Sequence, residues 1–295
     1  MAASLVLMIN SAVLGAEDDS PGALLKESLR LMEAKKYNDA AAMMYRYLEM
    51  VVDSNADRVI AIAQDIRFKL ATILIEENRL EEAADVLQDY IEKPLCKFPR
   101  QGMKMLATCY YEIGKPETPD GSPDKAAFEK CVTAIENALE YNENPVVVVK
   151  AVSEEDDKNA NVLAVSEEDD PEYTQDELVL LHLTLGEALY GLKKWAECID
   201  PFTYVIEKTT EEQRKGYAIM QVVNALIEIP DFARITDWIP QLYRTEARYD
   251  IRVNLALMNA AAALYDAGEY DSALPLYRMI VPRDELIAFQ KQKIR

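Results

Sequence analysis

Residue types that commonly carry catalysis or bind metals are scarce in this chain of 295 residues. It has one histidine, His182, and four cysteines at positions 96, 109, 131 and 198, none of them in a CxxC spacing. A zinc site needs clustered thiolates and imidazoles, so this pattern argues against one. The motifs GxxxxGK[ST], GxGxxG, GxSxG and HExxH are also absent. The sequence therefore predicts a protein that is not an enzyme and has no metal or cofactor site.

Basic charge and glycine are also in short supply. Lysine and arginine total 32 against 52 aspartates and glutamates, which gives a net charge of -20, and there are only 9 glycines. Proteins that bind nucleic acid need basic stripes along the phosphate backbone, so we expect no nucleic-acid partner. Apolar residues make up 50% of the chain, too many for a disordered acidic tail. A folded, acidic protein is expected.

The first 16 residues carry no charge and contain an apolar run from Leu5 to Leu14. Such a run is too short to span a bilayer as a helix and is typical of the apolar core of a signal peptide. We therefore expect a signal peptide over residues 1–16 and a periplasmic or otherwise extracytoplasmic location in a bacterium. No membrane span is expected, and Ala16 stands where a lipoprotein would need its cysteine. The alternative is a short apolar helix that caps the fold of a cytoplasmic adaptor.

Pairs of residues nine positions apart recur along the chain. In each pair the first residue is the last apolar residue on one face of a predicted helix, and the second lies on the next predicted helix. A turn is therefore expected between the two. We call them the first and second landmarks, and the helices that carry them the first and second helices of a hairpin. The pairs are Leu31 and Ala40, Leu74 and Ala83, Leu189 and Cys198, Leu226 and Ile235, and Leu264 and Ala273. A large apolar residue stands three positions before each second landmark, namely Tyr37, Leu80, Trp195, Phe232 and Tyr270.

The residues around the landmarks have helical periodicity. Leu185, Gly186 and Leu189 recur at spacings of one, three and four, as one face of an amphipathic helix requires. Small residues at Gly186 and Ala261 predict that the two helices of a hairpin approach closely, near Cys198 and Ala273 respectively. In one further unit Tyr110 and Cys131 take the landmark places, 21 residues apart, with an insertion of twelve residues that forms a surface loop.

These spacings resemble the tetratricopeptide repeat family, whose pattern is W-x2-L-G-x2-Y followed by A-x3-F and a trailing proline. One match runs through His182, Leu185, Gly186, Leu189, Cys198 and Phe202. Another runs through Leu257, Ala260, Ala261, Leu264, Ala273, Tyr277 and Pro282. Where no insertion intervenes, successive second landmarks are 37 to 43 residues apart, longer than the family norm of about 34, so a related helical-pair repeat is the alternative.

The resemblance implies an all-α fold, a right-handed α-solenoid of about six helix hairpins with an acidic insertion after the third. Hairpins 1–3 are expected within residues 17–142, the insertion at 143–175, and hairpins 4–6 within 176–295. After Pro282 the chain begins a seventh first helix that has no partner in this sequence. Either the native chain continues, or a homo-oligomer forms through this terminal helix.

The insertion contains the heptapeptide AVSEEDD twice, at residues 151–157 and 164–170. Residues 151–177 hold eleven acids and one lysine, a local charge of -10. The favoured interpretation is a solvated loop, because clustered like charges resist packing. A projecting β-hairpin from VVVVKAV and NVLAV is one alternative, and a calcium site is another, although SEEDDK lacks the spacing and turn glycine of an EF-hand loop.

The single histidine and the cysteines are interpreted as packed core residues. Cys131 and Cys198 occupy the small second-landmark position, where buried thiols are expected, and His182 lies where the family often has an aromatic residue. Cys109 and Cys131 lie on two helices of one unit, so a disulfide between them stays open for an exported protein.

Residues of the first helices that point away from their partner helix are expected to line a concave groove suited to a peptide or helix of a partner protein. They are Phe68, Ile75, Tyr111, Leu183, Tyr190, Tyr217, Met220, Asn224, Ile227, Met258 and Tyr265. The alternative is that these side chains only pack on neighbouring helices. In chaperone-binding members of the family a set of Lys and Asn residues binds a C-terminal carboxylate. Only Asn224 matches that set, so this function is not expected.

The function expected from the resemblance is therefore a non-catalytic scaffold for protein–protein interaction. The unpaired terminal helix leaves a second hypothesis, in which the chain is the non-catalytic superhelical part of a longer cell-envelope enzyme.

Overall fold

The computed structural model describes residues 20–116, 118, 121–144, 170–229, 231, 234–235, 237–238, 240–241, 249 and 251–287. The predicted signal peptide at 1–16, and the capping helix that is its alternative, lie outside the described residues. The same holds for residues 145–169, to which the predicted acidic loop, β-hairpin and calcium site belong, and for the last eight residues of the predicted terminal helix.

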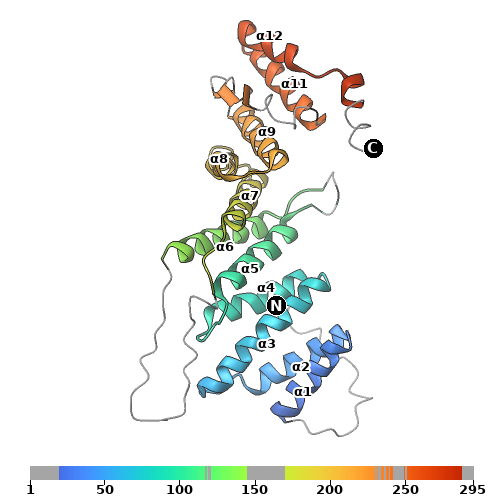
Figure 1. Cartoon of the computed structure of the whole chain (residues 1–295), viewed down its shortest axis with the longest axis vertical. Helices are drawn as coiled ribbons and strands as arrows, with labels where there is room; N and C mark the ends of the chain where they lie inside the picture. Colours follow the sequence, from blue (N-terminus) through green and yellow to red (C-terminus); the bar gives the residue numbers. More distant parts are fainter. Residues whose placement is uncertain are drawn as a thin grey trace. The chain divides into compact units, whose positions relative to one another are not determined.

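The chain forms two compact units, one ending at Lys97 and the other beginning at Phe98. Unit 1 contains α1 (Pro21–Glu33), α2 (Tyr37–Met50), α3 (Asp57–Glu76) and α4 (Leu80–Glu92). Unit 2 contains α5 (Pro99–Gly114), α6 (Lys125–Glu143), α7 (Gln175–Gly191), α8 (Ile199–Lys208), α9 (Glu212–Glu228), α11 (Ile251–Asp266) and α12 (Tyr270–Met279), shown in Figure 1. Among the described residues, no helix is long and apolar enough to cross a membrane.

Each unit is a stack of helix hairpins, and the described residues contain no strand. In unit 1 the hairpins α1–α2 and α3–α4 pack through α2 and α3. In unit 2 each helix from α5 to α9 contacts its successor, and α9 contacts the last hairpin through α11. Ile235, the second landmark after α9, is fully buried. The all-α solenoid architecture expected from the repeats is confirmed.

Local sequence sets where several helices begin. Pro21 and Pro99 occupy the first turn of α1 and α5, where a proline ring fits and no backbone donor is lost. The side chains of Asp124 and Thr174 accept hydrogen bonds from the first turn of α6 and α7. Thr174 and Glu177 form a capping box, which satisfies two otherwise unpaired backbone donors.

The turn inside a hairpin has the same geometry in four of the hairpins. The fourth residue after the first landmark has positive φ, and the fifth donates its N–H to the landmark carbonyl at 2.8–2.9 Å. The residues with positive φ are Lys35, Asn78, Lys193 and Gly268. This is a Schellman ending, in which glycine is preferred because a side chain costs about 1 kcal/mol there. Only Gly268 avoids that cost, so packing of the two helices must impose the turn in the other three.

Small residues allow close contact between helices of unit 2. A Cβ atom added to Gly186 would lie 2.8 Å from Cε1 of Phe202, one turn beyond the predicted contact near Cys198. The ring of Phe128 on α6 packs against both Gly114, the last residue of α5, and Gly191, the last residue of α7. A Cβ atom at either glycine would approach that ring to 2.3–2.4 Å. Phe128 thereby brings the ends of two consecutive first helices together.

Buried polar side chains hold the chain where it leaves a hairpin. Gln64 and Asn254 each lie ten residues before the first landmark of their hairpin. The Gln64 amide nitrogen donates to the carbonyls of Tyr90, Lys93 and Pro94, each at 3.0 Å. Asn254 donates to the carbonyl of Val281 at 2.7 Å and accepts from its N–H at 3.0 Å. Each side chain therefore satisfies backbone groups in the last turn of the second helix or just after it, where carbonyls have no partner within the helix.

Arg100 occupies the equivalent position in the third hairpin and holds the far end of the acidic insertion. Its guanidinium donates to the backbone carbonyl of Asp170 at 2.6 Å and pairs with the carboxylate at 3.2 Å. Its Nε donates to the side chain of Asn142 on α6 at 3.1 Å. Tyr173 completes the cluster by donating its hydroxyl to the carbonyl of Arg100 at 2.5 Å. Burial raises the pKa of Asp170, and hydrogen bonds and the charge of Arg100 partly oppose that shift. The chain thus returns to the hairpin beside the end of α6.

Gly186→Ala tests the close approach of α7 and α8. The new methyl group would lie 2.8–2.9 Å from three ring atoms of Phe202, which is fully buried, so the ring or the helices must shift. We expect the free energy of unfolding to fall by about 1–3 kcal/mol, measured by urea denaturation. Gly22→Ala on α1 is the matched control, because nothing lies within 4 Å of its added Cβ. Equal effects of the two substitutions would contradict the packing argument.

Asn254→Ala tests the polar side chains at the hairpin exits. It leaves the N–H and the carbonyl of Val281 without their partner in a buried place. We expect a loss of about 2–4 kcal/mol in the free energy of unfolding, since each buried unpaired group costs about 1–3 kcal/mol. Asn259→Ala, at an exposed position of the same helix, should change it by less than about 0.5 kcal/mol. A small effect of Asn254→Ala would show that the exit does not need this side chain.

Candidate protein-binding face

A row of hydrogen-bonded side chains crosses three consecutive first helices of unit 2. Tyr111 on α5 donates its hydroxyl to Oε2 of Glu187 on α7 at 2.5 Å, and Tyr217 on α9 donates to Oε1 of the same carboxylate at 2.7 Å. Gln221 donates to the hydroxyl of Tyr217 at 2.7 Å, and Asn224 donates to Gln221 at 3.4 Å. We call these five residues the first-helix row. All five are half-buried.

Burial and the shared carboxylate keep both tyrosines of the row neutral. Burial is the main cause that raises the pKa of Tyr111 and Tyr217 above the usual value, and Glu187 adds to it through its charge and hydrogen bonds. Lys115 lies over the ring of Tyr111, with Nζ 5.0 Å from the ring centroid, and the Arg252 guanidinium carbon is 5.9 Å from the centroid of Tyr217. The row is thus a set of neutral side chains that are hydrogen-bonded to one another and to the carboxylate of Glu187.

Apolar side chains predicted for the groove flank this row on the same helices. Leu183 and Tyr190 lie four residues before and three residues after Glu187, so they share its side of α7. On α9, Ile227 follows Asn224 by three residues and is half-buried. Met220, also predicted to line the groove, is only 6% exposed and belongs mainly to the core. Met258 and Tyr265 on α11, the next first helix, stand at the same places relative to Leu264 as Leu183 and Tyr190 do relative to Leu189. The row, its flanks and these two residues define what we call the first-helix face of unit 2.

The last hairpin carries the most exposed of the predicted residues. Met258 and Tyr265 on α11 are 48% and 56% exposed. Tyr265 stacks edge-on against Tyr270 across the turn, with ring centroids 5.1 Å apart, and Tyr190 does the same with Trp195 at 4.7 Å. One side of each tyrosine ring therefore contacts an aromatic residue of its own hairpin.

Phe68 and Ile75, the predicted residues of unit 1, both lie on α3 and are half-buried. The ring centroid of Phe68 is 5.4 Å from that of Tyr90 on α4. These two residues belong to a different unit from the first-helix row, and the ring of Phe68 packs on the second helix of its own hairpin.

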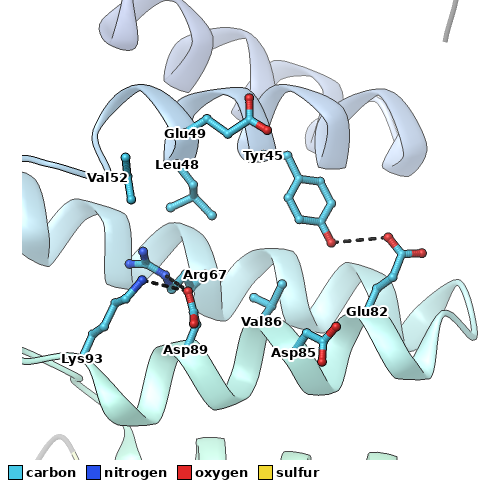
Figure 2. A pocket seen from close by; sticks show the side chains of 10 residues that line it. All are labelled: Tyr45, Leu48, Glu49, Val52, Arg67, Glu82, Asp85, Val86, Asp89 and Lys93. Carbon is cyan, nitrogen blue, oxygen red and sulfur yellow. Dashed lines mark hydrogen bonds and ion pairs between the residues drawn. The ribbon is translucent and has the colours of Figure 1, made fainter. Parts of the chain in front are cut away.

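Unit 1 has a recess that the sequence does not predict. It is open to solvent, has a volume of about 560 Å³, and lies between α2 and α4 with α3 beneath (Figure 2). Its lining combines apolar side chains with charged ones: Tyr45, Leu48, Glu49, Val52, Arg67, Glu82, Asp85, Val86, Asp89 and Lys93.

The charges in this recess largely satisfy one another. Figure 2 shows Asp89 between two cations; its Oδ2 is 2.8 Å from Nζ of Lys93 and 3.8 Å from Nε of Arg67. Tyr45 donates to Glu82 at 3.4 Å, and burial, followed by the charge of Glu82, raises the pKa of Tyr45 to about 12. Arg67, which is 7% exposed, also donates to Gln64 at 3.3 Å. Because both cations already face Asp89, the recess offers little to an anionic ligand.

The histidine and the buried cysteines have the environment of core residues. Burial raises the pKa of Cys131 to about 12 and those of Cys109 and Cys198 to about 11, so these thiols stay protonated near neutral pH. Cys109 and Cys131 remain separate thiols. His182 stacks on Tyr204 at 3.8 Å, and burial lowers its pKa. In the described residues, no three His, Cys, Asp or Glu side chains are grouped to hold a metal ion.

Sequence reasoning missed Glu187 and Gln221, the two residues that connect the row. Both stand between predicted residues of the same helix face, Glu187 between Leu183 and Tyr190 and Gln221 between Tyr217 and Asn224. A polar residue within an apolar stripe was the available signal. Its partners were not predictable, because they come from other helices.

Removing the hydroxyl donors tests the first-helix row. Tyr111→Phe and Tyr217→Phe each take one hydrogen bond from the half-buried carboxylate of Glu187, which should lower the free energy of unfolding by about 1 kcal/mol each. The double variant should lose more than the sum, since the carboxylate then has no tyrosine donor. Tyr265→Phe, at an exposed ring, should have almost no effect in the same urea titrations. Strict additivity would argue against a shared network.

Comparison with known proteins finds likeness in structure only. No family model matches the chain, and no curated protein matches it. Among solved structures it is similar to YrrB, a TPR protein with an unusual peptide-binding site, with a TM-score of 0.46, 14% identity, and coverage of 77% of this chain and 91% of that one. It is also similar to BtubC from P. vanneervenii, with a TM-score of 0.44, 12% identity and coverage of 91% and 92%.

A third similar structure consists of the nearly identical TPR-like repeats of a putative kinesin light chain from Podosopora anserina. Its TM-score is 0.41 at 10% identity, with coverage of 80% of this chain and 100% of that one. Several of the solved structures to which the chain is similar are TPR proteins, as the sequence predicts.

Proposed function

We propose that this protein is a non-catalytic interaction scaffold that binds a peptide or helix of a partner protein on the first-helix face of unit 2. The observation that carries the proposal is the first-helix row, which crosses α5, α7 and α9 without interruption. Side chains that hydrogen-bond across three helices are held in place before a partner arrives. Less conformational entropy is then lost on binding.

The composition of the face also suits a peptide. Leu183, Tyr190 and Ile227 supply half-buried apolar surface, while Gln221 and Asn224 supply amide groups. Apolar surface contributes most of the binding free energy in such sites, and a few fixed polar groups set the register of the bound segment. An extended segment that lies across the first helices would meet both kinds of group.

A catalytic role is not part of the proposal. The buried thiols are protonated, and the ring of His182 is stacked on Tyr204. Nucleophilic catalysis needs a nucleophile in hydrogen-bond reach of a base. Among the described residues, the hydrogen bonds of Cys131 and Cys198 go to the backbone carbonyls of Ala107 and Trp195.

Peptide selection with the full chain tests the proposal. A displayed library of random peptides is selected on the protein, and the affinity of selected peptides is measured by fluorescence anisotropy. Met258→Glu places a charge at an exposed position of the predicted groove and should weaken binding by about tenfold or more, because the charge is desolvated under the peptide.

Met50→Glu is the matched control for this experiment. Met50 is 51% exposed, close to the 48% of Met258, but it lies on a second helix of unit 1. It should leave the affinity unchanged. If no peptide is selected, or if the two substitutions weaken binding equally, the proposed site is wrong.

A further inference from the structure

Within the described part of the chain, the carboxylate of Glu187 accepts its hydrogen bonds from neutral groups. Its two carboxylate oxygens accept one hydrogen bond each, from Tyr111 at 2.5 Å and from Tyr217 at 2.7 Å. A carboxylate has about four lone-pair sites, so acceptor capacity remains on both oxygens. Both tyrosines carry a raised pKa and stay protonated, so they orient the carboxylate without neutralising its charge.

No cation of the described part of the chain forms an ion pair with Glu187, although cations lie near. Lys104 pairs with Glu177 at 2.5 Å, and Lys115 pairs with Glu112 at 2.7 Å. Arg252 lies on the face of the Tyr217 ring. A half-buried carboxylate has lost part of its hydration, and a charged hydrogen-bond donor would compensate for that loss better than neutral groups do.

The surroundings of this carboxylate suit a cation of one particular shape. With one acceptor site in use on each oxygen, the remaining capacity is divided between the two oxygens, which matches the parallel donors of a guanidinium. A guanidinium is also less strongly hydrated than an ammonium, so it loses less hydration on entering a half-buried site. The net charge of -20 favours the approach of a basic segment.

We propose that the first-helix face of unit 2 selects partner segments that carry an arginine, whose guanidinium binds both carboxylate oxygens of Glu187. This inference rests on the proposed function, because it names the chemistry of the segment bound at that face.

The peptides selected on the full chain provide the first test. Arginine should be enriched at one position of the selected sequences, and replacing it by citrulline should weaken binding to the unaltered protein by about 10–100-fold, the range expected for a charged hydrogen bond. Lysine at that position should give an intermediate loss. Citrulline keeps the shape and removes the charge, so this comparison needs no change in the protein.

Glu187→Gln provides the second test. It should weaken binding of the arginine peptide about as much as citrulline does, and the two changes together should cost little more than one alone, as a double-mutant cycle measures. Glu197→Gln is the matched control. It removes the same charge from a side chain that is 60% exposed in the turn between α7 and α8, and it should leave the affinity unchanged.

The outcomes separate this inference from the proposed function. Peptides that depend on Met258 but contain no enriched arginine, or that tolerate citrulline, would overturn the inference and leave the scaffold proposal standing. Equal losses from Glu187→Gln and Glu197→Gln would also overturn it, because general electrostatic attraction would then explain the preference. If no peptide is selected, the scaffold proposal and the inference fail together.

Discussion

The contact of Phe128 with two glycines is the constraint on which the arrangement of unit 2 depends. The ring sits between the last residues of α5 and α7, and neither end could approach it so closely with a side chain larger than hydrogen. The distance between two consecutive first helices follows from this contact. The ring centroid of Tyr111 lies 6.1 Å from that of Phe128. From this position the Tyr111 hydroxyl donates a hydrogen bond to Glu187 on the next first helix. Apolar packing on the second-helix side thus positions the polar row.

The buried polar groups of the hairpins follow a related logic. A repeat that bends back after every second helix leaves backbone groups unpaired at each exit, and a buried unpaired group is costly. Gln64, Arg100 and Asn254 meet this need from equivalent places in three first helices. Where no insertion follows the second helix, the neutral amide of Gln64 or Asn254 satisfies these backbone groups. Where an acidic insertion intervenes, an arginine with a buried aspartate and a tyrosine takes the amide's place.

Much of the fold was predictable because the repeat constrains the sequence. Landmarks nine residues apart identified the turns, since two packed helices need a small residue on one side and a fixed turn length. The prediction located Gly186 correctly at a close approach and differed by one turn in its partner, Phe202 in place of the segment at Cys198. The division into two units after Lys97 has no counterpart in the repeat pattern and was not predicted. The recess between α2 and α4 was missed because charged residues on second helices appear in sequence as ordinary solvated positions.

By itself, the sequence determined that this protein is a series of helix hairpins, where most of the turns fall, and that aromatic and apolar residues recur on one side of the first helices. Periodicity carries that information because it depends only on positions within one helix. The tertiary structure decided which of these residues act together. Met220 is buried in the core, and the rings of Tyr190 and Tyr265 pack against aromatic residues at their own hairpin turns. Glu187 is the centre of a hydrogen-bond network that spans three helices. A hydrogen bond between helices depends on the distance and rotation of both, and packing sets these quantities only after the hairpins have stacked.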